Sequence, residues 1–573
     1  MKKLIVNFTL LLLGFTQTNA QKMLFSEMLY RPTDSSITVQ SIFADSVQVY
    51  VEYGIVSGIY PYQTTPQLFA DSVPANVLVQ GLTPDTKYYY RMCYRLPNRG
   101  TYNIQQEHTF HTQRPPGATF TFDVEADPHD DYNSDTALYR LCLKNQLADA
   151  PDFMIDLGDF LMTDKLNNIH HIIPFDTISY RCQVFRNFYE TECHSVPLFI
   201  ALGNHEGEAM WNDTGGGNNI AVWDTRYREK YFLNPQPSNF YKGDTTHYPY
   251  IGLRESYYDW TWGDAQFIVL DPFWFINTKP DSTNTGEWLW TLGKTQYDWL
   301  QNVLDSSKAT FKFVFAHQIL GGGNGEGRGG VEWANYFEWG GENLDSSNGF
   351  TTYRPGWYKP TKDLLTEHHV NIFFHGHDHF FGEQEKECMI YQETPQPSLP
   401  NFVGDAAASY GYVSGLIIPN SGHLRVTVSD SSIKVEYVRV FEPADTNATQ
   451  HNEEVSATYF IGKTNCYDST LGVPTVIWNN NSINELVYPN PFMKQTTISF
   501  TLAQPERLTI SMYDEKGKLV RTLLGGNTIN AGKFDVVWDG NDGNGVPMPN
   551  GVYFYSIRSA DCGVKSGKVV LVR

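Results

Sequence analysis

Short runs in which apolar and polar residues alternate are the main feature of residues 22–113. The runs SVQVYVEYG and KYYYRMCYRL are two of them, and the turn GLTPDT lies between apolar stretches. A period of two residues indicates strands that bury one face and expose the other. We therefore predict a small β-sandwich over residues 22–113.

The pattern changes after the segment QRPPG, whose composition is that of a linker. Over residues 115–443, short apolar runs are separated by long segments of mixed character. Such runs are typical of strands that are buried on both faces. Their alternation with helices predicts an α/β domain built in layers.

Residues 444–484 are rich in Asn, Thr, Ser and Asp, and we predict a connection with little core of its own. Alternating strands return over residues 485–573, in runs such as TTISFTL and GVYFYSI, and predict a C-terminal β-sandwich. The oxygen-rich loop Asp539–Gly545 departs from the ligand order of an EF-hand, so it is interpreted as a plain turn. The chain is thus predicted to be multidomain.

The N-terminal segment MKKLIVNFTLLLLGFTQTNA combines two lysines, a short apolar run and small or polar residues. This order is typical of a signal peptide over residues 1–20, and the apolar run is short for a membrane anchor. No later segment is apolar enough to be predicted as a transmembrane span. We expect the protein to be secreted or held at the cell surface. Disulfides are permitted there, and Cys182 and Cys193 are the expected local pair.

Composition and charge narrow the classes of function. The 573 residues are 41% apolar and 14% aromatic, which is enough for several well-packed domains. The formal net charge of -21 disfavours a general affinity for nucleic acid or for an anionic membrane. An anionic substrate would have to be attracted by a local cationic site.

Polar side chains recur directly after apolar runs. The runs and their polar ends read ATFTFDVEADPHD, DFMIDLGD, VPLFIALGNHE, FKFVFAH and VNIFFHGHDH. They place the following residues after predicted strands: Asp127, His129, Asp159, Asn204, His205, Glu206, His317, His377 and His379. Ligands bind at the carboxyl ends of strands in such sheets, so we expect these groups to share one site.

The donors in this set are oxygen and nitrogen atoms, without a thiolate. Such donors suit zinc, manganese or iron and argue against a closed structural zinc site. The set holds more donors than one tetrahedral ion needs. It is sufficient for two ions about 3.5–4 Å apart, an arrangement that supports displacement at phosphorus.

The motifs D-x-H, GD, GNHE, a lone His after a strand and GHxH stand in the order found in calcineurin-like metallophosphoesterases. Over roughly residues 118–441 the chain resembles this superfamily, with a layout similar to that of purple acid phosphatases. The resemblance implies a four-layer αββα domain with two divalent or trivalent ions of Mn, Zn or Fe. It implies that Asp127, His129 and His379 hold one ion, that Asn204, His317 and His377 hold the other, and that Asp159 bridges them.

The resemblance also implies a mechanism. Hydroxide held by the ions would attack a phosphate monoester. His205 would face the substrate as a proton donor or as a stabiliser of developing charge, and Glu206 would orient it. Purple acid phosphatases have an iron-binding tyrosine three residues after the bridging Asp, where this chain has Met162, so a tyrosinate-to-iron colour is not expected.

Two further resemblances concern the flanking domains. The run LVQGLTPDTKYYYRMCYR resembles fibronectin type III domains, including the one that precedes the catalytic domain of purple acid phosphatases. The block from YPNPF to GKVVLVR resembles the C-terminal sorting domain of proteins exported by the bacterial type IX secretion system. That resemblance implies the type IX machinery as a partner.

Several assignments stay open. Arg328 is the one cation in the Gly-rich segment after His317 and is a candidate to bind a phosphate, with a solvated loop arginine as the alternative. The same site could serve a phosphodiesterase or a nucleotide hydrolase, and a catalytically inert surface binding protein is an alternative of another class. The remaining polar residues near these motifs are interpreted as structural, namely His170, His171, Asp271, His368, His369, His375 and Asp378.

Overall fold

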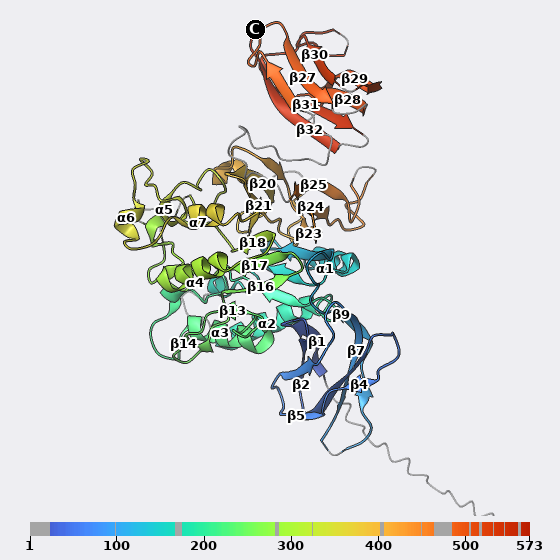
Figure 1. Ribbon diagram of the computed structural model, residues 1–573, viewed down its shortest axis with the longest axis vertical. Helices are drawn as coiled ribbons and strands as arrows, with labels where there is room; N and C mark the ends of the chain where they lie inside the picture. The colour runs from blue at the N-terminus through green and yellow to red at the C-terminus, as the bar shows by residue number, and fades with distance from the viewer. Residues whose placement is uncertain are drawn as a thin grey trace, which may run out of the picture. The chain divides into compact units, whose positions relative to one another are not determined.

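The computed structural model of the chain describes residues 23–97, 99–166, 175–280, 286–323, 325–401, 406–447, 450–462, 484–502, 506–514, 518–530, 532–543, 545–559 and 563–573. The predicted signal peptide and the pair His170 and His171 lie outside these ranges. The chain divides into two compact units, Met1–Asp430 with Tyr437–Ser456, and Ser431–Glu436 with Ala457–Arg573. Figure 1 shows the helices and strands of both. Among the described residues, no helix has the length and apolar character needed to cross a bilayer.

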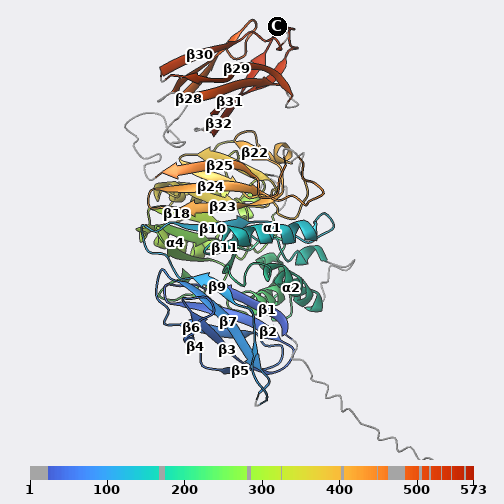
Figure 2. The ribbon, with the colours of Figure 1, turned by 90° about the vertical axis from the view of Figure 1, so that its right-hand side faces the viewer.

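Residues 23–111 form two antiparallel sheets (Figure 2). The first contains β1 (Met23–Tyr30), β2 (Ser36–Phe43) and β6 (Ala75–Gln80); the second contains β4 (Tyr62–Gln63), β3 (Val47–Gly54), β7 (Lys87–Arg95) and β8 (Asn103–Ile104), with β5 (Gln67–Phe69) on β3 and β9 (His108–His111) on β7. Alternate residues such as Val49, Val51, Tyr90 and Met92 point into one apolar core. The likeness to a fibronectin type III domain stays a prediction.

The central part of the chain contains two larger sheets. The six-stranded sheet has the order β12 (Leu198–Ile200), β11 (Met154–Asp156), β10 (Phe120–Glu125), β23 (Gly422–Val428), β24 (Ser432–Arg439) and β25 (Val455–Gly462). The eight-stranded sheet has the order β13 (Lys242–Gly243), β16 (Tyr258–Trp262), β17 (Ala265–Val269), β18 (Phe311–Phe315), β19 (Ile372–His375), β21 (Met389–Glu393), β20 (Phe381–Lys386) and β22 (Leu416–Ile418). A separate pair joins β14 (His247–Tyr248) to β15 (Gly252–Leu253).

Aromatic side chains fill the space between the two sheets. Phe122 of β10 meets Phe267 of β17 edge to face, with ring centroids 5.0 Å apart. Phe199 of β12 stacks on Trp260 of β16 at 4.2 Å. Each such pair adds about 0.5–1.5 kcal/mol to the free energy gained by burial. This layer fixes the distance between the sheets and therefore between the loops that follow their strands.

Helices cover the outer faces of both sheets. Figure 1 shows α1 and α4 on opposite sides of strands β16 to β18. The six-stranded sheet packs against α1 (Thr136–Asp149), α2 (Phe175–Tyr189) and α3 (Ile220–Tyr231), and the eight-stranded sheet packs against α4 (Gly293–Asp305) and α7 (Thr361–Glu367). The remaining helices are short, namely α5 (Phe337–Gly340), α6 (Phe350–Tyr353), η1 (Thr163–Leu166), η2 (Met210–Asn212), η3 (Glu287–Leu289) and η4 (Ala407–Tyr410). The layers are thus helix, sheet, sheet and helix.

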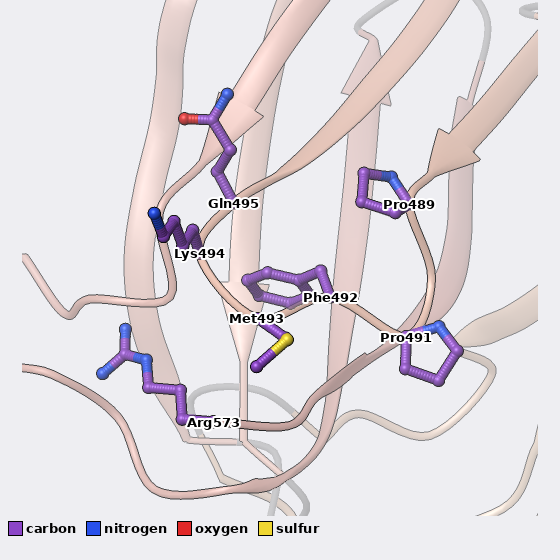
Figure 3. Close-up of a pocket in the computed structure, with 7 residues that line it drawn as sticks. All are labelled: Pro489, Pro491, Phe492, Met493, Lys494, Gln495 and Arg573. Carbon is purple, nitrogen blue, oxygen red and sulfur yellow. The ribbon is translucent and has the colours of Figure 1, made fainter.

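The second unit carries two sheets from the C-terminal part of the chain. They contain β26 (Asn484–Tyr488), β27 (Thr496–Leu502) and β30 (Gly532–Trp538), and β29 (Leu519–Ile529), β28 (Glu506–Tyr513), β31 (Gly551–Ser559) and β32 (Gly563–Leu571). A pocket of about 640 Å³ is lined by Pro489, Pro491, Phe492, Met493, Lys494, Gln495 and Arg573 (Figure 3). No lining side chain is an imidazole or a carboxylate, so this pocket does not contain the predicted site.

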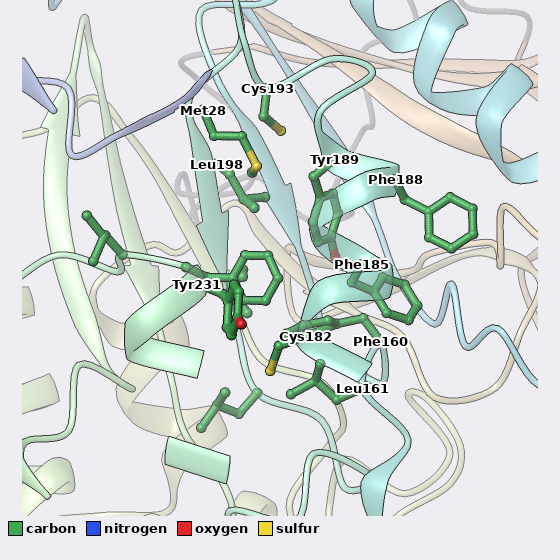
Figure 4. Packing of buried hydrophobic residues seen from close by; sticks show 14 of the residues in the cluster. Met28, Phe160, Leu161, Cys182, Phe185, Phe188, Tyr189, Cys193, Leu198 and Tyr231 are labelled. Atoms are coloured by element: carbon green, nitrogen blue, oxygen red, sulfur yellow. The ribbon is translucent and has the colours of Figure 1, made fainter. Parts of the chain in front are cut away.

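Two expectations are wrong in this structure. The predicted connection 444–484 contains β25, which pairs at the edge of the six-stranded sheet, because the run VSATYFIG alternates as a strand does. Cys182 and Cys193 are both free and buried rather than bonded. They lie apart in the apolar cluster beneath α2 (Figure 4), where Cys193 Sγ contacts Met154 Sδ at 3.6 Å. The bond was expected because the two cysteines are close in the sequence, but part of α2 lies between them.

Arg186 of α2 joins the helix to the N-terminal sheets. Its side chain is fully buried. The guanidinium donates to Tyr30 Oη at 2.9 Å, to Gln40 Oε1 at 2.7 Å and to the carbonyls of Ser26 and Gln40 at 2.7 and 2.9 Å. A buried charge with this many partners is costly to disturb, since each partner would remain in the interior without a donor.

We expect Arg186→Ala to lower the free energy of unfolding of this unit by about 3–5 kcal/mol, because it removes one side of a buried charged network. Urea denaturation followed by tryptophan fluorescence measures the change. The matched control is Arg226→Ala at an exposed position of α3, for which a change within about 0.5 kcal/mol is expected. Equal effects of the two substitutions would contradict a structural role for Arg186.

Candidate metal centre

Each of the five apolar runs forms a strand that ends just before its polar residues. The strands end at Glu125 (β10), Asp156 (β11), Ile200 (β12), Phe315 (β18) and His375 (β19). β10, β11 and β12 are parallel, and so are β18 and β19. Their carboxyl ends therefore bring the polar loops of both sheets to one place.

The first group of candidate ligands consists of Asp127, His129 and His379, whose ligand atoms lie within 4.8 Å of one another. Asp127 Oδ1 is 3.3 Å from His379 Nε2 and 3.5 Å from His129 Nε2. Asp127 Oδ1 and His129 Nε2 are buried and have no hydrogen-bond partner. Buried polar atoms are normally paired, so these orphaned atoms fit a site that holds a cation.

The second group gathers around His317 Nε2. This nitrogen lies 3.0 Å from Asn204 Oδ1, 3.2 Å from Asp159 Oδ2 and 3.2 Å from His377 Nδ1. The second candidate cluster, Asp159, His317 and His377, again has ligand atoms within 4.8 Å of one another. These separations are compatible with ligands that share one ion at about 2.0–2.2 Å.

Hydrogen bonds at the far side of each ring define which nitrogen faces the site. His317 Nδ1 is 2.9 Å from the Leu157 carbonyl, and His377 Nε2 is 2.8 Å from the Glu326 carbonyl. A carbonyl only accepts, so both of these nitrogens carry hydrogen and the opposite ring nitrogens present lone pairs. Four acceptors, from Asp159, Asn204, His317 and His377, then face one another without a donor.

Asp159 lies between the two groups. Its Oδ2 is 3.2 Å from His317 Nε2 and 3.8 Å from His129 Nε2. Its Oδ1 accepts the backbone N–H of His205 at 2.8 Å. One carboxylate that reaches both groups is what a bridging ligand requires.

The backbone at the site is strained. Asp127, His129, Asp159, His377 and His379 all have positive φ angles, between 55° and 78°. Each such conformation costs non-glycine residues of order 1–3 kcal/mol, and clusters of them mark functional sites. The glycines of GNHE and GHxH have steric roles here, because a Cβ at Gly203 would lie 2.2 Å from Asp159 Oδ1 and one at Gly376 would lie 2.5 Å from Asp127 Oδ2.

The electrostatics of the site favour ionised carboxylates. Burial raises the pKa of Asp127, but the charges of His379 and His317 outweigh it and hold the pKa well below its usual range. Burial lowers the pKa of His317, whereas the charges of Asp159 and Asp127 raise it, with a net value of about 10. The carboxylates of Asp159 and Asp127 thus attract positive charge to the position of His317 Nε2, and a bound cation would supply that charge in place of a proton.

Two family models match the chain. Residues 490–562 match FlgD Ig-like domains, and residues 120–381 match calcineurin-like phosphoesterases. Residues 120–381 form a calcineurin-like phosphoesterase domain. Such domains use a dinuclear metal site, and the two groups of candidate ligands fit one.

Solved structures give a further comparison, whereas no curated protein matches the chain. The chain is similar to PhoD at 15% identity, with a TM-score of 0.56, over 77% of this chain and 90% of that one. It is also similar to purple acid phosphatase PPD1 from yellow lupin (Lupinus luteus) seeds at 16% identity, with a TM-score of 0.48, over 76% and 74%. At 15% identity the likeness to PhoD concerns the fold alone.

His205 of the phosphoesterase domain lies beside the bridging position. Its Nε2 is 3.9 Å from Asp159 Oδ2, and its side chain is partly exposed. Its ring is thus near the bridging carboxylate and reachable from solvent. A role for His205 toward the substrate stays a prediction.

Glu206 differs from expectation. Its carboxylate accepts the backbone N–H groups of Asp159 at 3.0 Å, of Leu161 at 3.1 Å and of Gly203. It therefore braces the loop that carries Asp159, whereas it was expected to orient the His205 ring. Burial and the charge of Asp159 raise the pKa of Glu206 to about 8.

Arg328 contacts the phosphoesterase loop 375–379. Its Nη1 donates to the His377 carbonyl at 2.7 Å and lies 3.1 Å from Asp378 Oδ1, while its Nε donates to Glu326 at 2.9 Å. The other Asp378 oxygen accepts from Gly329 N and Tyr412 Oη at 2.8 and 2.9 Å. Arg328 and Asp378 together hold the backbone of His377, so Arg328 is a positioning residue in this structure.

Arg181 is a residue that the sequence did not point to. From α2 it donates to the carbonyls of His129 and Leu161, each at 2.7 Å, and to Asp130 Oδ2 at 2.7 Å. It thereby ties together the loops after β10 and β11. Arg181 lies within a helix and belongs to none of the motifs, so the sequence gives no indication of this role.

A pocket of about 340 Å³ opens beside the first group of ligands. It is lined by His129, Asp131, Asn133, Lys165, His379, Gln396 and Leu399. Two candidate ligands thus form part of its wall. Lys165 supplies a cationic side chain to the same wall.

We expect Arg328→Gln to weaken metal binding by about 10–100-fold, as loss of contacts behind a ligand does. Metal titration of the stripped protein in competition with a chelator measures the affinity, and steady-state kinetics with a phosphate ester measures KM separately. Glu326→Gln is the matched control, since it alters one partner of Arg328 but keeps the bonds to residue 377. A raised KM with unchanged metal affinity would instead assign Arg328 to substrate binding.

Proposed function

We propose that the protein is a secreted, dinuclear metal-dependent phosphoesterase that hydrolyses phosphate monoesters. The ligands of one ion would be Asp127, His129 and His379, those of the other Asn204, His317 and His377, with Asp159 between them. The supporting geometry is the pair of groups described above. The metal would be Mn, Zn or Fe, all of which accept nitrogen and carboxylate donors.

The arrangement of facing acceptors carries this proposal. Three acceptor atoms surround the lone pair of His317 Nε2 at 3.0–3.2 Å. They are Asn204 Oδ1, His377 Nδ1 and Asp159 Oδ2. In a buried place such a set is repulsive unless a cation lies among its members. Bound ions would supply Lewis acidity toward the phosphoryl group and a water of lowered pKa.

The chain's own residues would orient the substrate and handle the proton. His205 Nε2 lies 3.9 Å from Asp159 Oδ2. It would therefore be within hydrogen-bonding distance of a phosphoryl or leaving-group oxygen that is bound next to Asp159. His129 and His379 form part of the pocket wall, so an ester bound in the pocket would lie against the first group of ligands. Asp159 lies in a loop that Glu206 braces, and it would keep the two groups of ligands at a fixed separation.

A monoester is favoured by charge. Its dianion carries more negative charge than a diester, and Lys165 adds a cation to the pocket wall. The chain as a whole has a formal charge of -21, so an anionic substrate depends on this local attraction. Hydrolysis of a diester or of a nucleotide is the alternative outcome of the assay below.

Secretion belongs to the same proposal. It is supported by the signal-like pattern of residues 1–20 and by the likeness of the C-terminal block to type IX sorting domains. The type IX machinery would then be a partner and the bacterial surface or medium the destination. N-terminal sequencing of exported protein measures where the mature chain begins.

We expect the protein loaded with manganese, zinc or iron to hydrolyse aryl phosphate monoesters with a higher kcat/KM than bis-aryl phosphates, because the pocket compensates the second charge of the dianion. Release of the aryl alcohol between pH 5 and 10 measures both rates. Faster diester hydrolysis would favour the phosphodiesterase alternative. Absence of turnover with every ion and ester would leave the inert binding protein as the better description.

We expect His205→Gln and Asp159→Asn to fail in different ways. Loss of a proton donor at His205 should lower kcat by about 10²–10⁴-fold without loss of metal. Asp159→Asn should reduce bound metal as well as activity, because it removes a negative ligand shared by both groups. Metal analysis beside steady-state kinetics separates the two effects. Full activity in Asp159→Asn would refute the assignment of the bridge.

A further inference from the structure

A third cluster of ligand-type side chains lies under α1, away from the two groups described above. It consists of Asp123 on β10, Asp149 at the end of α1 and His423 on β23, with ligand atoms within 4.8 Å of one another. β10 and β23 pair directly, and Asp123 lies opposite Arg425 in their register. Asp123 precedes Asp127 by four residues, roughly 13 Å along an extended strand. The cluster is therefore a separate set of donors.

The Asp123 carboxylate is the feature that requires an explanation. The residue has no exposed surface, and neither of its oxygens has a hydrogen-bond partner. A buried carboxylate left without donors costs several kcal/mol unless it takes up a proton or meets a cation. One of its oxygens is aimed into the cluster with Asp149 and His423. This is an independent observation beyond the gathering of acidic groups.

The other two members are already arranged as ligands. His423 Nε2 lies 2.8 Å from Asp149 Oδ2, and the second nitrogen, Nδ1, lies 3.7 Å from Cys142 Sγ. Arg425 Nη1 donates to Asp149 Oδ1 at 2.6 Å and so orients that carboxylate from behind. Contacts of this kind behind a ligand set the direction of its lone pairs.

The surrounding charge also favours a cation. Glu192 is fully buried, and neither of its carboxylate oxygens has a hydrogen-bond partner. Burial, and after it the charge of the nearby Asp123, raises the pKa of the Glu192 carboxyl. Arg425 is paired with Asp149 and balances one negative charge. Arg425 also lies opposite Asp123, so one cationic side chain faces the three carboxylates of Asp123, Asp149 and Glu192.

We propose that Asp123, Asp149 and His423 bind a third metal ion, a divalent first-row cation such as Zn²⁺ or Mn²⁺, in a structural site of the six-stranded sheet. One imidazole nitrogen and two carboxylate oxygens are the donors, a set that suits zinc and manganese. The ion would join α1 to β10 and β23. Arg425, with a partly exposed side chain, and Asp149 mark the side open to solvent.

The test is the number of ions bound per chain. The full-length protein is stripped with a chelator, loaded with Zn²⁺ or Mn²⁺ and passed through a desalting column, and its metal is measured by plasma mass spectrometry. We expect Asp123→Asn to bind one ion fewer per chain than the wild-type protein. The difference is the readout, so it holds whether the dinuclear centre of the proposed function is filled or not.

Glu192→Gln is the matched control. It also removes a fully buried and unpartnered carboxylate, but it lies outside the cluster, and we expect it to bind as many ions as the wild-type protein. Equal metal content in the wild-type protein and Asp123→Asn would overturn the proposal and leave Asp123 as a protonated carboxyl. A loss of one ion in Glu192→Gln but not in Asp123→Asn would overturn it as well.

A second variant keeps the test decisive if Asp123→Asn does not fold. Asp149→Asn lies at the helix end, near solvent, and should also bind one ion fewer. In addition, the chelator should lower the midpoint temperature of thermal unfolding of the wild-type protein. The same treatment should lower the midpoint of Asp149→Asn by less. An equal shift together with an unchanged ion count would refute the site.

Discussion

The repulsion among buried acceptors is the constraint on which the rest of the phosphoesterase domain depends. Asp127, Asp159, His317 and His377 direct oxygen atoms and lone pairs into one small buried volume. Such a volume is stable only with positive charge inside it. The strained backbone, the glycines and the bonds of Arg181 and Arg328 can all be understood as the means that hold these groups together against that repulsion.

The layers of the fold give this arrangement its rigidity. Rings such as Phe122, Phe267, Phe199 and Trp260 interlock between the sheets. A close-packed interior transmits small displacements rather than absorbing them. The ends of strands from both sheets are thereby fixed relative to one another, and groups that arrive on loops keep separations of a few ångströms. Precise chemistry on loops thus rests on an apolar layer that itself contains none of the ligands.

The sequence was sufficient for the parts of the site that follow from strand periodicity. Each polar cluster, from Asp127 to His379, stands directly after a short apolar run, and the strands end where those runs end. It was insufficient where a side chain acts across the fold. Arg181 carries no motif, Glu206 bonds backbone N–H groups rather than the neighbouring ring, and Arg328 braces His377. Spacing along the chain also suggested a Cys182–Cys193 bond that the helix keeps apart, and polar composition concealed the strand β25.

Helix α2 has two arginines that face different parts of the molecule. Arg186 reaches Tyr30 and Gln40 of the N-terminal sheets, whereas Arg181, little more than one turn away, holds the carbonyl of His129. Helix α2 therefore connects the N-terminal sheets to the loop that carries His129, a candidate metal ligand. Removal of residues 23–111 would take away the partners of Arg186, so a fragment that begins at residue 120, where the family match starts, would hold α2 less firmly.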